Sequence, residues 1–186
     1  MRLYFIRHGE SESNTLGKIS NCNLPNALTE MEQRQVFSLV EKPHGKRKSI
    51  CRIFTSPILR ARETVEILTA RLSLPVECAQ ALREPDCGIL EGRGDKVAWM
   101  EHNFWKNNWL RGREHDRGPE GGETYNDVRK RFTEFIEYLI ANHGETDTQT
   151  GLLLVTHGEL LLLALPGLFP CLDVLIFSNT DWDIPV

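Results

Sequence analysis

The sequence predicts an α/β fold, a three-layer sandwich whose central sheet is mostly parallel. Three short apolar runs, at residues 2–6, 50–55 and 151–156, each stop at a polar segment, as buried strands do. Segments with helical periodicity separate these runs, and strands that alternate with helices favour parallel pairing. Residues 1–186 are expected to form a single domain, because a chain of this length can enclose one substantial core.

The first run places two basic side chains at its carboxyl end. Residues 2–6 are mostly apolar and rich in β-favouring types, and Arg7, His8, Gly9 and Glu10 follow at once. Buried charge is costly without a partner, so an apolar strand that runs straight into Arg7 and His8 indicates a cleft. A strand end that simply meets solvent is the alternative.

The second run leads into a helix that carries another arginine. After residues 50–55, Ser56 is a good N-cap and Pro57 suits the first helical position. Arg60 should therefore lie in the opening turn of this helix.

The third run ends in a second His-Gly pair, His157-Gly158. Ligand sites of open parallel sheets gather beyond the carboxyl ends of the strands. The residues expected to converge there are Arg7, His8, Arg60 and His157. Two arginines offer forked donors to a phosphate group, and two imidazoles can supply a nucleophile and a further donor.

The remaining elements follow from caps and apolar spacing. Capping boxes at Thr29 and Thr124 should start helices that reach about residues 40 and 141. Apolar spacing also predicts the buried face of two helices. The helix after Pro57 should bury Ile58, Ala61, Val65, Leu68 and Leu72, and the helix after Thr124 should bury Tyr125, Val128, Phe132, Phe135 and Leu139. Further strands are expected at 76–82 and 175–177, and a further helix at 158–165.

Residues 95–110 predict a helix with an aromatic and apolar stripe. Such a stripe is more often core than pocket, so burial is expected for Val97, Met100, Phe104, Trp105 and Trp109. The charged loop 111–117 that follows either presents cations to a second anionic group or is plain surface.

Composition narrows the function classes. The net charge of -4, from 22 Lys and Arg against 26 Asp and Glu, argues against a nucleic-acid binder. The apolar stretch 152–168 is too short and too interrupted for a membrane span, and no signal peptide precedes the first strand. Five cysteines without a CxxC pair indicate free thiols in the reducing cytoplasm.

Five stretches carry a family resemblance: RHGE at 7–10, SPILRARET at 56–64, LREPDCGILEG at 82–92, PEGGET at 119–124 and VTHGE at 155–159. In this order they resemble the histidine phosphatase superfamily, the group that includes the cofactor-dependent phosphoglycerate mutases. The resemblance spans residues 2–165. It implies a helical cap over the active site, at roughly residues 84–122, whose segment 95–117 helps to select the substrate.

The resemblance also implies roles for single residues. The expected catalytic residues are His8, Glu84, His157, Arg7 and Arg60, and the expected substrate-binding residues are Asn14, Ser20 and Gly158. His8 would be the nucleophile and Glu84 the proton donor, while the other catalytic residues would hold phosphate oxygens. Glu91 and Glu159 are the competing carboxylates. No metal and no cofactor is expected.

Three functions compete. The first is a phosphomonoesterase that acts through a phosphohistidine on a small phosphorylated metabolite. The second is a phosphoglycerate mutase, but residues 84–88 lack the Arg and Tyr of the mutase pattern ERHYG, Asn21-Cys22 stands where Gly-Trp is common, and Glu159 stands where mutases favour Asn. The third, a catalytically silent phosphate-binding module, is disfavoured because every expected pocket residue is present.

Overall fold

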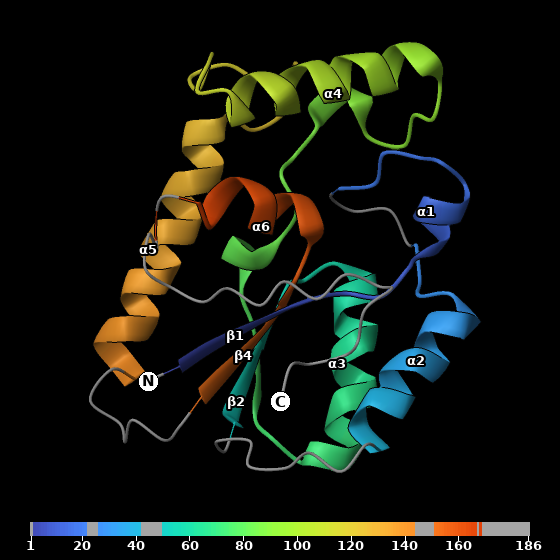
Figure 1. Cartoon of the computed structure of the whole chain (residues 1–186), viewed down its shortest axis with the longest axis vertical. Helices are drawn as coiled ribbons and strands as arrows, with labels where there is room; N and C mark the ends of the chain where they lie inside the picture. The colour runs from blue at the N-terminus through green and yellow to red at the C-terminus, as the bar shows by residue number, and fades with distance from the viewer. Residues whose placement is uncertain (1, 22–25, 42–49, 144–150, 167, 169–186) are drawn as a thin grey trace.

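A parallel sheet forms the middle layer of the molecule (Figure 1). The structure is a computed structural model that describes residues 2–21, 26–41, 50–143, 151–166 and 168. Its strands are β1 (Arg2–Arg7), β2 (Ile50–Thr55), β3 (Val76–Cys78) and β4 (Gly151–Thr156). They pair in the order β1-β4-β2-β3, and every adjacent pair is parallel. The α/β prediction is confirmed, and the sheet is parallel throughout the described residues. The strand predicted at 175–177 lies outside them.

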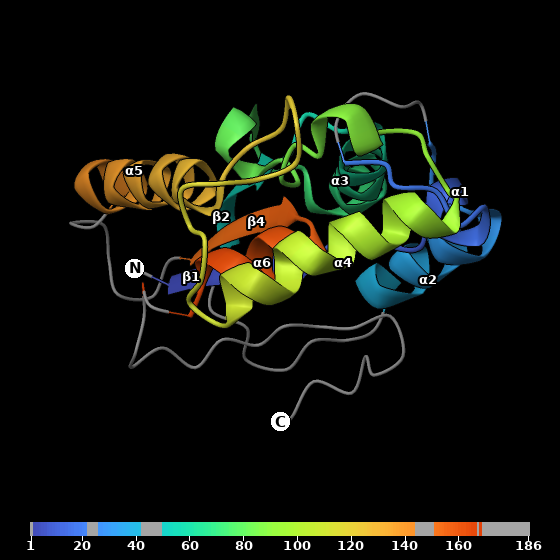
Figure 2. The same ribbon diagram turned by 90° about the horizontal axis from the view of Figure 1, so that it is seen from above.

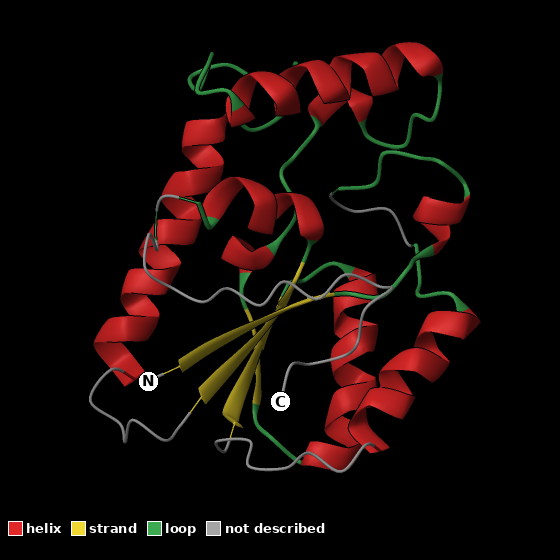
Figure 3. Ribbon diagram, in the orientation of Figure 1, coloured by secondary structure: helices red, strands yellow, loops and turns green. Residues whose placement is uncertain are grey.

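Helices cover both faces of this sheet (Figure 3). The helices are α1 (Glu12–Thr15), α2 (Glu30–Glu41), α3 (Leu59–Leu72), α4 (Lys96–Leu110), α5 (Tyr125–His143) and α6 (Gly158–Ala164), with short 3₁₀ turns η1 (Gln80–Leu82) and η2 (Gly88–Leu90). α5 lies on one side of the strands, and α2 and α3 lie on the other. α4 crosses above α6 and the carboxyl ends of the strands (Figures 1 and 2).

The two faces of the sheet bury two separate apolar clusters, because successive strand residues point to opposite sides. The cluster on the side of α5 and α6 includes Phe5, Phe54, Leu152, Leu154, Val128, Phe132 and Leu160. The cluster on the side of α2 and α3 includes Ile53, Leu153, Val155, Val36, Ala61, Val65 and Leu68. β4 lies between β1 and β2, and all six of its residues are buried.

The capping box at Thr124 forms as predicted, but only one half of the box at Thr29 does, because the backbone N–H of Thr29 donates to the carbonyl oxygen of Glu10 at 3.0 Å. At the start of α5, the backbone N–H of Thr124 donates to Asp127 Oδ2 at 3.0 Å, and the N–H of Asp127 donates back to Thr124 Oγ1 at 3.1 Å. At the start of α2, the N–H of Glu32 donates to Thr29 Oγ1 at 3.3 Å. The predicted inward residues of α5 are buried or pack against the core.

The start of α3 differs from the prediction. The helix begins at Leu59, and Ile58, which has extended backbone angles, is its N-cap. Ser56 still accepts the N–H of Ile58 at 3.3 Å, but it lies before the helix instead of capping it. Arg60 is in the opening turn, as predicted. Leu72 was expected to be buried and is 40% exposed, because it is the last residue of the helix.

Two further expectations of burial fail for identifiable reasons. The first strand was predicted to be buried, yet only Phe5 is buried in β1, because β1 lies at an edge of the described sheet. In α4, Val97, Met100 and Phe104 are 52–66% exposed, so this part of the predicted apolar stripe faces outward. Trp109 is buried as expected.

No described helix is both long enough and apolar enough to cross a lipid bilayer.

Candidate active site

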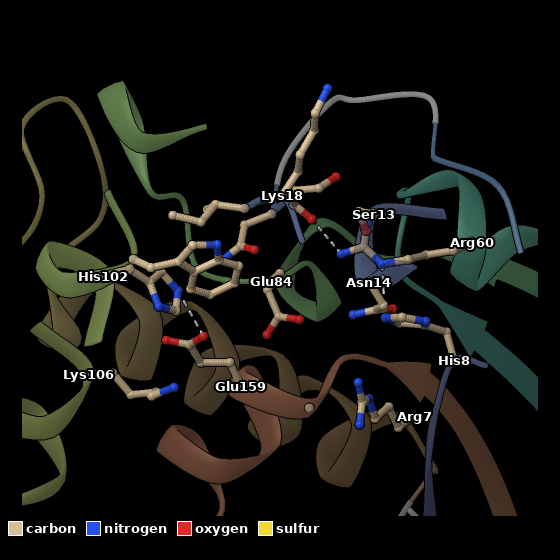
Figure 4. A pocket seen from close by; sticks show the side chains of 15 residues that line it. Arg7, His8, Ser13, Asn14, Lys18, Arg60, Glu84, His102, Lys106 and Glu159 are labelled. Carbon is tan, nitrogen blue, oxygen red and sulfur yellow. Dashed lines mark hydrogen bonds and ion pairs between the residues drawn. The ribbon is translucent and has the colours of Figure 1, made fainter. Parts of the chain in front are cut away.

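One cavity of about 180 Å³ gathers most of the predicted site residues at the carboxyl ends of the strands (Figure 4). Its lining includes Arg7, His8, Arg60, Glu84, Asn14, Ser20 and Gly158. These residues come from β1, α1, α3, α6 and the loops between elements, and they meet at the carboxyl ends of the strands as the parallel topology predicts. His157 does not line the cavity itself but lies behind it, fully buried, with its ring centroid 4.9 Å from that of His8.

His8 is held as a neutral imidazole with a defined tautomer. Its Nδ1 bonds to the carbonyl oxygen of Gly9, and since a carbonyl only accepts, we assign the ring proton to Nδ1. Nε2 then carries the lone pair and accepts from Arg60 Nε at 2.9 Å. Burial, followed by the nearby Arg60 charge, holds the pKa of His8 well below its ordinary value of 6.5. The side chain is therefore uncharged at neutral pH, as a nucleophile must be.

Arg60 connects this imidazole to the loop that contains Ser20. It is buried in the opening turn of α3, and its NH2 group donates to the backbone carbonyl of Ser20 at 2.8 Å. Ser20 is therefore a contact of Arg60 through its backbone, while its hydroxyl accepts from Asn26 Nδ2 at 2.7 Å. The loop before α2 is thus tied to the arginine that donates to His8.

Arg7 brings a second guanidinium group to the cavity. Its Nε is buried, and no described residue accepts a hydrogen bond from it. A Cβ atom at Gly158 would lie 3.2 Å from this Nε and 3.3 Å from Arg7 Cδ, tighter than nearly all ordinary contacts. Glycine at position 158 is therefore what lets the start of α6 pack against Arg7. An unpaired buried guanidinium donor indicates an anionic ligand.

His157 is sandwiched between Ser56 and Glu84. Its Nε2 is 2.7 Å from Ser56 Oγ, and its Nδ1 is 3.6 Å from Glu84 Oε2. Ser56 Oγ also accepts the N–H of Ile58 at 3.3 Å, which uses one of its two lone pairs, so either partner can be the donor in the bond to Nε2. Burial first, and then the His8 and Arg60 groups, lower the pKa of His157 well below 6.5.

Glu84 is a buried carboxyl group with a strongly raised pKa. Its Oε1 accepts the backbone N–H of Leu160, in the first turn of α6, at 2.8 Å. Burial first, and the charge of Glu159 second, raise the pKa of Glu84 from 4.5 to about 7, against the opposing charges of Arg60 and Arg7. A carboxyl group with this pKa can give up a proton and take one back near neutral pH.

The loop around Glu84 is braced by the PEGGET motif. Glu123 accepts from the backbone N–H of Asp86 at 2.9 Å and from Arg131 Nε at 2.8 Å. Arg131 in turn donates to the backbone carbonyls of Ala81 at 2.7 Å and Glu84 at 3.3 Å. Both ends of the loop are therefore fixed to α5, which positions the carboxyl group over the cavity.

Two other predicted polar residues have structural partners. Asn14 lines the cavity, and its Oδ1 accepts the backbone N–H of Ser11 at 3.0 Å, which completes a capping box on α1. Glu91, the weaker carboxylate candidate, accepts the backbone N–H of Asn21 at 2.9 and 3.1 Å. Glu91 therefore holds the backbone at Asn21, which lines the cavity, but does not line the cavity itself.

Sequence reasoning missed the residues that α4 contributes. Trp99, His102 and Lys106 line the cavity, and they recur every three or four positions along one face of the helix. The exposed apolar stripe lies on another face, so the aromatic pattern alone pointed to the wrong side. The spacing of Trp99, His102 and Lys106 was the signal that could have found this face. None of the described residues of the loop 111–117 lines the cavity.

Glu159 faces the same cavity but is paired differently from Glu84. Its Oε2 lies 3.2 Å from His102 Nε2, and the two side chains are only 15% and 6% exposed. This pair joins the start of α6 to α4 across the cavity (Figure 4).

His8, Glu84 and His157 form a buried cluster, but their ligand atoms do not suit a metal ion. Their ligand atoms lie within 4.8 Å of one another. However, Nδ1 of His8 carries a proton that it donates to the carbonyl oxygen of Gly9, so His8 could offer a metal ion only Nε2, the atom that faces Arg60. The adjacent Arg60 charge would also repel a cation.

Comparisons with known proteins find relatives of this chain in sequence and in structure. A curated relative from Cronobacter sakazakii, a probable phosphoglycerate mutase GpmB, is 30% identical over 132 residues, which are 71% of this chain and 60% of that protein. This chain therefore spans about three fifths of the length of that relative.

Solved structures give a closely similar fold. The alpha-ribazole phosphatase from Shigella flexneri is 25% identical with a TM-score of 0.69, over 87% of this chain and 76% of that one. A mycobacterial glucosyl-3-phosphoglycerate phosphatase, solved as a complex with VO3, is 26% identical with a TM-score of 0.75, over 92% and 83% of the two chains.

The family itself is decided by the match of residues 3–174, nearly the whole chain, to the family model of the histidine phosphatase superfamily, branch 1. The five motifs fall within this range, and the structure brings their polar residues to one cavity or to its immediate support. The chain belongs to the histidine phosphatase superfamily.

Proposed function

We propose that this protein is a phosphomonoester hydrolase that transfers a phosphoryl group first to His8 and then to water. The observation that carries the proposal is the presence of a neutral imidazole and a carboxyl group with a pKa of about 7 in one cavity beside two arginines. Phosphate esters resist attack because their charged oxygens repel nucleophiles, so neutralising that charge and positioning the reactants supply most of the rate.

In the first step, Nε2 of His8 attacks phosphorus while the bond from phosphorus to the ester oxygen breaks. The lone pair on Nε2 supplies the new N–P bond, and the other ring proton stays on Nδ1, where it is hydrogen-bonded to the carbonyl oxygen of Gly9. Glu84 gives its proton to the departing alkoxide, which leaves as an alcohol. Arg7 and Arg60 offset the charge of the equatorial oxygens.

In the second step, Glu84 acts as a base. Its carboxylate takes a proton from water, the water oxygen attacks phosphorus, and the N–P bond breaks. Inorganic phosphate and the neutral imidazole are the products, and Glu84 is again protonated. His157 lies behind Glu84, with its Nδ1 3.6 Å from Glu84 Oε2, so the imidazole adds to the buried surroundings of this carboxyl group.

The names of two structural neighbours support hydrolysis, because both are called phosphatases, one of alpha-ribazole and one of glucosyl-3-phosphoglycerate. The substrate of this chain would be a small phosphorylated molecule, as the cavity of about 180 Å³ suits a compact ester.

A phosphoglycerate mutase is the second candidate, because the curated relatives carry that name. A mutase uses the same phosphohistidine but must return the phosphoryl group to the rebound intermediate. Incubation with 3-phosphoglycerate and its bisphosphate primer separates the two functions. We expect inorganic phosphate to form faster than 2-phosphoglycerate, and efficient isomerisation would make the chain a mutase.

The direct test of the proposed function is to trap the intermediate. Labelled p-nitrophenyl phosphate, mixed with the protein and quenched without acid, should leave label on a peptide that contains His8. His8→Ala should carry no label and show no turnover. Label on His157 instead, or a burst of nitrophenolate without any labelled histidine, would overturn the mechanism.

A further inference from the structure

The cavity has two ends with different chemistry (Figure 4). Arg7, His8 and Arg60 lie at one end, where the phosphate would bind. Trp99, His102 and Lys106 from α4, together with Glu159, line the other end. Glu84 lies between them, so the alcohol part of a substrate whose ester oxygen meets Glu84 would extend toward α4.

The carboxylate of Glu159 is held in place by His102. A proton on His102 Nε2 makes the 3.2 Å contact with Glu159 Oε2 a hydrogen bond, and the burial of both side chains restricts their rotation. No described residue bonds to the second oxygen, Oε1, which is not a buried atom. Because Glu159 lines the cavity, Oε1 is left as an acceptor that no described residue occupies.

A fixed carboxylate distinguishes hydroxyl groups from other carboxylates. It accepts a hydrogen bond from a hydroxyl group but repels a second negative charge, and repulsion is strong at a few ångströms in a partly buried site. Lys106, one turn from His102 on the same helix face, adds a donor beside this acceptor. Neighbouring hydroxyl groups, each both donor and acceptor, match such a pair.

We propose that Glu159, held by His102, is a specificity-determining residue that selects phosphate esters of polyhydroxylated, sugar-like alcohols and rejects esters whose alcohol carries a carboxylate. This inference rests on the proposed function, since it names the substrate class of the same site. Rejection of a carboxylate would also distinguish this chain from an enzyme that acts on phosphoglycerate, whose substrate has a carboxylate two carbons from the phosphorylated carbon.

Two small phosphate esters form a matched pair of substrates for the test. Glycerol 3-phosphate and 3-phosphoglycerate share the phosphorylated carbon and the next hydroxyl group, and they differ only in a terminal CH₂OH or carboxylate. Both lose a primary alkoxide, so any change in the protonation of Glu84 affects both equally. The ratio of their kcat/KM values therefore reports on the alcohol end alone.

We expect the wild-type protein to favour glycerol 3-phosphate by about tenfold or more. Glu159→Gln removes the charge but keeps the shape, and it should reduce the ratio to within about threefold of one by improving phosphoglycerate turnover. Glu101→Gln makes the same charge change on α4 away from the cavity lining, and should leave the wild-type ratio unchanged.

Two results with the wild-type protein alone would overturn the inference. One is a higher kcat/KM for 3-phosphoglycerate than for glycerol 3-phosphate, and the other is equal kcat/KM values for the two esters while p-nitrophenyl phosphate is hydrolysed. An unchanged ratio in Glu159→Gln would overturn it as well. If the wild-type protein releases phosphate from none of these esters, the proposed function fails first, and this inference fails with it.

Discussion

Replacing Glu84 by glutamine tests the proton donor with little change in shape. Glu84 Oε1 accepts the N–H of Leu160 at 2.8 Å, and the amide oxygen of a glutamine can accept the same bond. The variant should therefore fold and bind phosphate, but it has no proton to give to a departing alkoxide.

The expected loss follows from the raised pKa. The pKa of Glu84 is about 7 instead of 4.5, mainly through burial. At pH 7 about half of the sites then carry the proton, against about one in 300 at the ordinary pKa, a gain of about 150-fold in the acid form. Glu84→Gln should lower kcat/KM for an alkyl phosphate by about 10²–10⁴-fold, the usual contribution of a positioned acid.

The assay compares two leaving groups in single-turnover measurements. Nitrophenolate departs without a proton, so the variant should lose about tenfold or less with p-nitrophenyl phosphate. In the wild-type protein, kcat/KM for the alkyl ester should fall as pH rises through about 7, because the acid form of Glu84 is lost there. This decline should be absent in the variant and with p-nitrophenyl phosphate.

Equal losses with both leaving groups would refute the assignment of Glu84 as the acid. A decline near pH 7 that persists in Glu84→Gln would refute it too. If Glu159→Gln shows the larger difference between the leaving groups, the acid is Glu159 instead.

Three further changes test the supporting structure. Arg60→Lys should weaken vanadate inhibition by about tenfold or more, because an ammonium group cannot donate in a fork to Ser20, His8 and an oxyanion together; unchanged inhibition would contradict this role. Glu84→Gln should also raise the free energy of unfolding at about pH 8 by about 1–3 kcal/mol, measured with urea. The sign follows from the raised pKa in the folded state: the stabilising contribution of the wild-type carboxyl is complete below 4.5 and is lost as pH rises through about 7, so the two proteins should be equally stable near pH 4. Gly88→Ala should lower the melting temperature and cost about 2–4 kcal/mol, because Gly88 has a φ of +52° and a Cβ there would collide with the backbone of Glu120; a stability equal to wild type would show that this turn is not constrained.

The sequence was sufficient to predict how the phosphate end is assembled. Parallel strands align their carboxyl ends, so side chains far apart in sequence, such as His8 and His157, had to meet once the topology was assigned. The strands are recognised as short, nearly continuous apolar runs, which is the pattern of parallel strands that are covered on both faces. These predictions depend on local patterns that many residues reinforce.

The alcohol end was not predictable in the same way. α4 has apolar residues on an exposed face and aromatic residues on the inner face, so its periodicity does not decide which side meets the cavity. Ser56 matched an N-cap pattern, yet extended backbone at Ile58 delays the helix and leaves the hydroxyl beside His157. The bond between His102 and Glu159 joins two elements whose relative placement only the tertiary structure supplies.

The central position of β4 has a consequence for how the enzyme could diversify. His157 directly follows a strand whose six residues are all buried, so local opening that displaces this imidazole would need nearly global unfolding. α4 lies outside that sheet and reaches the rest of the site through side-chain contacts such as the bond from Trp99 Nε1 to Gly17 O at 2.7 Å. Under the proposed function, substitutions on this one helix would exchange one alcohol for another, while His157 and the strand before it keep the full stability of the core.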